Sequence, residues 1–105
     1  MIIVVTQSGA LELRDHQSFR AFKIVDESGA NSNDLSSALA GIARLAADGN
    51  AAWVSPDGLM RLLPAPPSVD WRAAFDNMVG VAAKHGWVHE TDGTIRAHIE
   101  RRATR

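Results

Sequence analysis

Three histidines in the C-terminal part of the chain are the residues whose type and spacing could bind a metal ion. His85 and His89 stand four positions apart, the spacing that puts two imidazoles on one face of a helix, and His98 follows them. Gly86, however, should end the helix between the first two histidines, so the spacing loses its meaning. We therefore expect surface histidines here and no metal site.

Acid–base catalysis would need a carboxylate or an imidazole whose pKa is shifted by burial or by a charged neighbour. In a hairpin over residues 87–100, Glu90 is the one acid turned towards the core side. It lies near the open end of the hairpin, where we expect its side chain to reach solvent and not to act as a buried base. An alternative hypothesis is a small enzyme or ligand-binding protein with a pocket at a subunit interface. Its proton-transfer groups would be His89, His98 and either Glu90 or Glu100. The sequence has no phosphate loop, dinucleotide fingerprint, zinc-protease helix or calcium loop, so we name no catalytic residue and no cofactor.

Two segments of similar sequence carry most of the other candidate residues. One segment reads LAADGNAAWVSPDGLMRLL and the other reads VAAKHGWVHETDGTIRAHI. Each contains the end of an amphipathic helix, a glycine, a Trp–Val pair, a turn with Asp–Gly and a strand with an arginine. We interpret them as tandem helix–strand–strand (αββ) units over residues 33–63 and 68–100. Either a duplication or a common helix-to-hairpin pattern would explain the likeness.

The helices that open these units have recognisable ends. Asn33 or Asp34 caps the first helix, whose apolar residues recur at helical spacing until Gly49 ends it. Ser68 or Asp70 caps the second helix. The apolar face of the second helix consists of Trp71, Phe75, Met78, Val79 and Ala82.

Residues 1–27 predict N-terminal strands, because MIIVV is apolar and β-branched, Ser8–Gly9 is a turn signal and ALELRD alternates. Residues 15–27 fit a helix or a strand, and we favour a strand from about Ala21 to Asp26. Together with the two units, these strands predict an α+β fold. Its form would be a two-layer sandwich, a largely antiparallel sheet with two helices on one face.

The register of the second hairpin decides which side chains share a face of the sheet. A two-residue turn at Asp92–Gly93 would pair His89 with Arg96 and Trp87 with His98. The valine and isoleucines of this hairpin would then lie under the helices. Its polar residues and its tryptophan would lie on the outer face.

In the first unit, the loop SPDG with Gly58 in the left-handed conformation would pair Val54 with Met60 and Trp53 with Arg61. A small monomer rarely leaves two large aromatic side chains in water, so this patch indicates an interface or a ligand surface. The alternative is that the N-terminal segment folds over the tryptophans. The predicted contact surface consists of Trp53, Arg61, Trp87, His89, Arg96 and His98.

Composition and charge narrow the class of partner. The chain has 105 residues, 46% hydrophobic and 22% charged, which is typical of a soluble protein with a single domain over residues 1–105. No apolar run approaches the ~20 residues that cross a bilayer. The formal net charge is −1, although residues 94–105, including a basic tail at 101–105, carry +3. This balance disfavours a broad nucleic-acid surface, and single-stranded nucleic-acid binding is our second alternative.

The sequence has no cysteine, which excludes disulfides and thiolate metal sites and suits a cytoplasmic protein. Nine arginines against two lysines indicate a bacterial genome of high GC content. We predict a small cytoplasmic bacterial protein that works as a non-catalytic homo-oligomeric or accessory binding module through its outer sheet face. The expected partner is a second copy in a homodimer, or else a protein or small molecule, and not a membrane.

Overall fold

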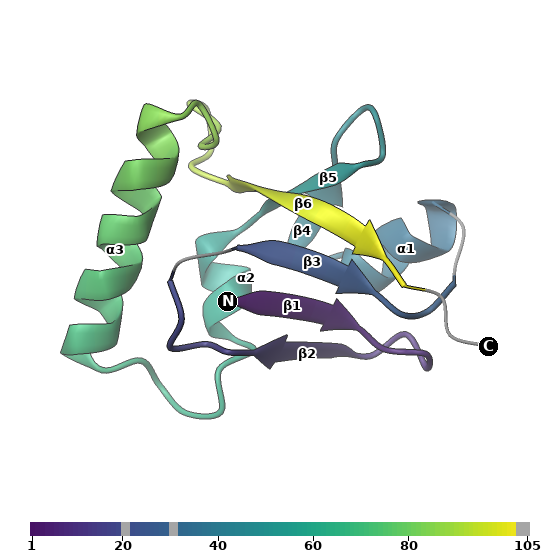
Figure 1. Ribbon diagram of the computed structural model, residues 1–105, viewed down its shortest axis with the longest axis horizontal. Coiled ribbons are helices and arrows are strands. Elements are labelled where there is room, and N and C mark those ends of the chain that lie inside the picture. The colour runs from purple at the N-terminus through teal and green to yellow at the C-terminus, as the bar shows by residue number, and fades with distance from the viewer. Residues whose placement is uncertain (20–21, 30–31, 103–105) are drawn as a thin grey trace.

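The computed structural model describes residues 1–19, 22–29 and 32–102. Within these residues the structure is mixed α+β, a curled six-stranded sheet with three helices (Figure 1). The strands are β1 (Ile2–Val5), β2 (Leu11–Arg14), β3 (Lys23–Asp26), β4 (Ala43–Leu45), β5 (Ala51–Val54) and β6 (Ile95–Arg101). The helices are α1 (Ser32–Leu39), α2 (Pro56–Met60) and α3 (Val69–Lys84).

The described strands lie in the order β2-β1-β3-β6-β5-β4. The pairs β1–β2, β4–β5 and β5–β6 are antiparallel, whereas β1–β3 and β3–β6 are parallel. The sheet is therefore mixed, where the sequence predicted a largely antiparallel one. Parallel neighbours need long connections, and the chain supplies them with residues 6–22 between β1 and β3 and residues 27–94 between β3 and β6.

The N-terminal strands follow the predicted pattern. β1 and β2 form an antiparallel hairpin whose turn contains Gly9 with a φ of +83°. The predicted strand at residues 21–26 is confirmed over Lys23–Asp26, and Ala21 lies outside the described residues. Of the predicted basic tail, Arg101 ends β6, and residues 103–105 also lie outside the described residues.

The first helix is much shorter than predicted, because α1 ends at Leu39 and not near Gly49. Gly41 has a φ of +92°, the conformation in which a glycine commonly ends a helix. Leu39 and Ile42 are both buried, so their helical spacing reflects a helix end followed by a turn into the core. Residues 43–45, predicted to be helical, form β4.

The predicted hairpin at SPDG is wrong, because residues 56–60 form α2. Ser55 caps this helix by accepting a hydrogen bond from the Gly58 N–H at 3.3 Å, and Pro56 lies in its first turn. A Ser–Pro–Asp sequence starts a helix as readily as a turn, which explains the error. Gly58 is a helical residue here, and a Cβ at this position would lie 2.7 Å from the Cα of Ile42. Glycine therefore lets α2 approach that backbone.

The second predicted helix is confirmed as α3. The Ser68 hydroxyl accepts a hydrogen bond from the Trp71 N–H at 3.1 Å, and Gly86 follows the helix with a φ of +76°. Trp71, Phe75 and Ala82 are buried on its core side, as their helical spacing predicted. Of the two predicted caps, Ser68 is the cap of the helix.

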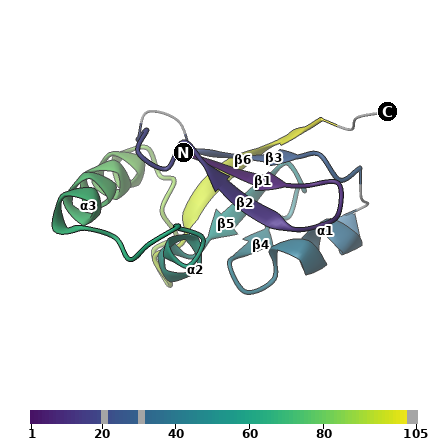
Figure 2. The ribbon, with the colours of Figure 1, turned by 90° about the horizontal axis from the view of Figure 1, so that it is seen from below.

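The hydrophobic core lies against one face of the sheet. Alternation along β6 buries Ile95, Ala97 and Ile99 and turns Arg96 and His98 to the opposite, outer face. Figures 1 and 2 show α1 and α2 on the core side and α3 beside the end of the sheet, with no described helix over the outer face. The helices contribute Leu35, Leu39, Leu59, Trp71, Phe75 and Ala82 to the core.

Candidate functional site

Tryptophans and arginines alternate across the outer face of the sheet. Trp53 of β5 stands opposite Arg96 of β6 on one side and opposite Arg44 of β4 on the other. The Arg96 N–H donates to the Trp87 carbonyl at 2.7 Å, so Trp87 lies on the far side of Arg96. Directly opposed residues of antiparallel strands share a face. We call these four residues, Trp87, Arg96, Trp53 and Arg44, the Trp–Arg row.

The second hairpin has a different register from the predicted one. Its strand pairing is a single bridge between Val88 and Ile95, which places Trp87 opposite Arg96 and not opposite His98. The turn comprises residues 90–93, because the His89 N–H donates to the Thr94 carbonyl at 2.8 Å. The observed register differs from the predicted one by two residues. Side chains alternate between the two faces with a period of two, so the polar residues still point outward as predicted.

Arg96 differs from the neighbouring cations in its lack of an acidic partner. Arg44 contacts Asp92 at 2.7 Å, and Lys23 contacts Glu100 at 3.1 Å. Among the described residues, no side chain forms a hydrogen bond or ion pair with the exposed Arg96 guanidinium. Its positive charge is therefore available for an anion from outside this part of the chain.

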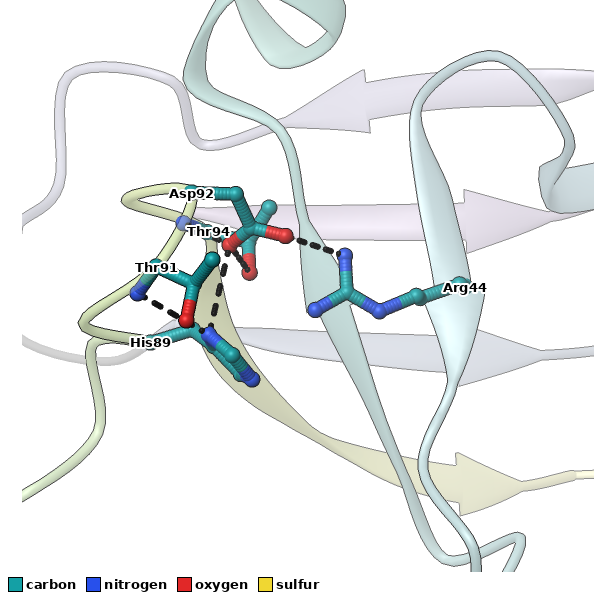
Figure 3. Close-up of polar contacts among 5 residues, drawn as sticks. All are labelled: Arg44, His89, Thr91, Asp92 and Thr94. Carbon is teal, nitrogen blue, oxygen red and sulfur yellow. Dashed lines mark hydrogen bonds and ion pairs between the residues drawn. The ribbon is translucent and has the colours of Figure 1, made fainter.

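Asp92 organises the turn beside the Trp–Arg row (Figure 3). Its carboxylate accepts hydrogen bonds from the Thr94 hydroxyl at 2.7 Å and the Thr94 N–H at 3.1 Å. Arg44 binds the other carboxylate oxygen, and His89 Nδ1 lies 3.7 Å from the carboxylate. The Thr94 hydroxyl and N–H, followed by Arg44, lower the pKa of Asp92 from 3.8 to about 2. This carboxylate is thus charged at neutral pH and holds Arg44 in place.

Each tryptophan of the row lies against a histidine. The half-buried Trp53 meets His89 edge to face, with ring centroids 5.1 Å apart. Trp87 stacks on His85 with centroids 4.6 Å apart, and 47% of its surface remains exposed. The predicted alternative of an N-terminal segment that covers the tryptophans therefore does not hold for Trp87.

Arg61 lies apart from the other predicted contact residues. It follows α2, where its backbone N–H donates to the Asp57 carbonyl and its guanidinium donates to the Gly41 carbonyl at 3.4 Å. The predicted pairing with Trp53 is wrong because α2 occupies the place of the expected strand. Conversely, the sequence analysis missed Arg44, because residues 43–45 were assigned to a helix.

The candidate proton-transfer groups do not share one pocket. His89 and Glu90 line a surface hollow with Trp53, and Glu90 is exposed in the turn, which confirms the expectation that its side chain reaches solvent. His98 is exposed on the outer face opposite Lys23. Lys23 binds Glu100 and lowers the pKa of that carboxyl. Within the described ranges, no group of three His, Asp or Glu side chains could hold a metal ion.

A cavity of about 210 Å³ lies between α3 and the start of β6. Its walls are mainly apolar, and Asn77 and Arg96 are its polar lining residues. This cavity was not predicted from the sequence, because the whole apolar face of α3 was expected to lie in the core. The available signal was a second stripe at helical spacing, formed by Ala74, Met78 and Val81.

Neither a protein-family model, nor a curated protein, nor a solved structure matches this chain. In the part of the chain that the structure describes, every helix is too short or too polar to cross a membrane. The Trp–Arg row and the cavity are therefore the features that bear on function.

Proposed function

We propose that this chain is a non-catalytic binding module whose contact surface is the Trp–Arg row with His89 and His98. The observation that carries the proposal is Arg96, which stands between Trp53 and Trp87 in the sheet and whose guanidinium pairs with no described side chain, on a face that no described helix covers. An aromatic ring of a partner placed over this guanidinium would gain about 0.5–1 kcal/mol at an exposed site. Tryptophan and arginine are also the side chains that most often anchor protein interfaces.

We take the partner to be a second copy of the chain. A two-fold interface joins the same patch on both subunits, so the patch must be complementary to itself. The outer face meets this requirement because it carries both signs of charge, with Arg14, Lys23 and Arg44 beside Glu12 and Glu100. The unpaired Arg96 of one copy would then bind an acid of the other copy.

Light scattering of the wild type and of surface variants tests this proposal. Trp87→Ala and Arg96→Gln remove exposed side chains, so both should fold like the wild type by far-UV circular dichroism. We expect a wild-type dimer, and monomers for both variants. Arg14→Gln, which changes a cation of the same face outside the row, should remain dimeric as the matched control. A wild type that is monomeric at high concentration contradicts the homodimer.

Single-stranded nucleic-acid binding is a second candidate, favoured by the alternation of aromatic rings and guanidinium groups along the row. Such binding must weaken steeply as salt increases. Titration of a fluorescent oligonucleotide at two salt concentrations tests it, and a flat response excludes it.

A small enzyme or ligand-binding protein is the remaining alternative, supported by the hollow that His89 and Glu90 share with Trp53. A catalytic imidazole should titrate well away from its usual pKa of about 6.5. Nuclear magnetic resonance (NMR) titration of the histidines measures this, and ordinary values for all of them would leave the enzyme without a base.

We also propose that residues 33–63 and 68–100 are copies of one αββ unit in a two-layer arrangement within a single domain, with α2 in the place of the last strand of the first copy. The antiparallel contact of β5 with β6 supports this interpretation. Each Trp–Val pair lies beside β6, with Trp53–Val54 at the end of β5 and Trp87–Val88 ahead of the turn at residues 90–93. A cytoplasmic location belongs to the same proposal and depends on the absence of cysteine.

A further inference from the structure

Hydrogen bonds and ring contacts fix both ends of α3, and Phe75, Met78 and Val79 pack its middle turns against the core. At its start, the Trp71 indole N–H donates to the His16 carbonyl at 2.8 Å, and the Trp71 ring meets Phe19 at 5.6 Å. At its end, the Ala82 carbonyl accepts a hydrogen bond from the Trp87 N–H at 2.9 Å. The cavity of about 210 Å³ lies beside the middle turns of the helix, between these two attachments.

The walls of this cavity suit an apolar group. Ala74, Met78 and Val81 form a stripe along α3, and Phe22 and Trp87 also line the cavity. The small side chain of Ala74 leaves the space open. An apolar cavity of about 150 Å³ holds benzene, so the larger volume here accommodates a ring or a short alkyl chain with a small polar group.

The polar lining of the cavity suits a single negative charge. Arg96 lines it with a guanidinium that pairs with no described acid, and Asn77 adds an amide. A guanidinium binds a carboxylate through two parallel hydrogen bonds. A cation would be repelled, and a neutral ligand would leave the guanidinium without an anionic partner. Among the described lining residues, a phosphate dianion would find one cationic group where such ligands usually meet several donors.

We infer that this cavity binds a small monocarboxylate with an apolar tail, such as a short-chain or arylalkyl acid. Arg96 binds the carboxylate, and the stripe on α3 with Phe22 and Trp87 encloses the tail. This inference goes beyond the proposed contact function and does not depend on it, although Arg96 and Trp87 belong to both surfaces.

NMR titration with hexanoate and with neutral hexanamide tests the inference without any variant. We expect saturable shifts of the Trp87 indole N–H and of residues 74–82 with hexanoate. Hexanamide should bind about tenfold more weakly or worse, because a hydrogen bond to a charged group is lost. Equal affinity for the two ligands, shifts that map elsewhere, or an absence of saturation would overturn the inference.

Variants separate this site from the Trp–Arg row. Ala74→Phe fills the cavity from α3 and should abolish hexanoate binding while the molar mass in solution stays that of the wild type. Arg96→Gln should weaken hexanoate about tenfold and make hexanoate and hexanamide equivalent. Trp53→Phe and Arg14→Gln lie outside the cavity and should bind hexanoate like the wild type. Undiminished hexanoate binding by Ala74→Phe would refute the site even if the wild type is a dimer.

Discussion

Replacement of Gly58 by alanine should destabilise the protein, whereas the same replacement at Gly80 should stabilise it. Both glycines are helical, Gly58 in α2 and Gly80 in α3. A Cβ at Gly58 would meet the Ile42 Cα at 2.7 Å, its Cβ at 2.9 Å and the Gly41 carbonyl oxygen at 3.1 Å. A Cβ at Gly80 meets nothing within 4 Å. Both substitutions change helix propensity in the same direction, but only Gly58→Ala adds close contacts, so the difference between the two variants measures the effect of packing.

The magnitudes follow from two opposing effects. Alanine gains about 1 kcal/mol over glycine in a helix interior, and Gly80→Ala should show a gain of up to that size. Overpacking of a core costs about 1–3 kcal/mol, and the upper end applies to Gly58 because its close neighbours are backbone atoms that no rotamer change can move. Gly58→Ala should therefore lose about 2 kcal/mol in net free energy of unfolding. For a domain of this size, that loss lowers Tm by about 8–16 °C.

Urea unfolding followed by tryptophan fluorescence and by far-UV circular dichroism measures both variants. The midpoints should move in opposite directions at an unchanged slope, since neither variant alters the surface exposed on unfolding. Gly58→Ala with the stability of the wild type, or with a gain like that of Gly80→Ala, would show that α2 does not approach the Ile42 backbone. The assignment of residues 56–60 to a packed helix would then fail.

Two further predictions concern the Asp92 turn and the start of α3. Because the pKa of Asp92 is lowered from 3.8 to about 2 in the folded chain, its carboxylate contributes stability that is complete above about pH 4 and is lost as the pH falls towards 2. The difference in urea midpoint between the wild type and Asp92→Asn should shrink over that range, and a difference independent of pH would contradict the hydrogen bonds with Thr94. Ser68→Ala should cost about 1 kcal/mol because the Trp71 N–H loses its acceptor, and Ser68→Asp should restore the wild-type urea midpoint.

The elements that the sequence predicted well are those whose signals are local. α3 has a serine cap, a buried stripe and a terminal glycine with positive φ, and each signal acts within a few residues. β6 alternates over its whole length, so the inward and outward orientation of its residues was readable before its partners were known. The outward orientation of Arg96 and His98 followed from this alternation alone.

The errors concentrate between residues 40 and 60, where each local signal permits two structures. Gly41 and Gly49 both have positive φ, and either could have ended the first helix. Ser55 and Pro56 suit a helix start as well as a hairpin turn. The burial of Leu59 against the core decides between these possibilities, and that contact depends on segments distant in sequence. Because residues 43–45 were predicted to be helical, Arg44 was left out of the predicted contact surface. Because a strand was predicted after the SPDG turn, Arg61 was included in it.

The neighbours in the candidate site were beyond local reasoning. The parallel contact of β3 with β6 joins residues more than seventy positions apart, and the cavity needs Phe22 to approach α3 from the N-terminal part of the chain. Alternation places Arg96 on the outer face, but it cannot say that Trp53 and Trp87 stand on its two sides. The type and orientation of each candidate side chain could be predicted from the sequence. Its neighbours in the site could not, because they come from segments that are distant in the chain.

Arg96 links the two proposals, because it belongs to the Trp–Arg row and also lines the cavity. One guanidinium pairs with one carboxylate through both of its parallel donors. A carboxylate held from the cavity therefore occupies the donors that a second copy of the chain would use. Binding free energies are reciprocal, so hexanoate should weaken self-association by the same factor by which self-association weakens hexanoate.

Light scattering at saturating hexanoate gives the first of these factors, and hexanoate titrations at low and high protein concentration give the second. Equal factors above one would show that the two contacts compete for a shared group, either Arg96 or Trp87. Factors of one would mean that the row and the cavity use different donors, and self-association would then have to be centred on another part of the outer face. Arg96→Gln supplies the control, since it removes the shared group: this variant should be monomeric and bind hexanoate about tenfold more weakly, and hexanoate should no longer change its molar mass in solution.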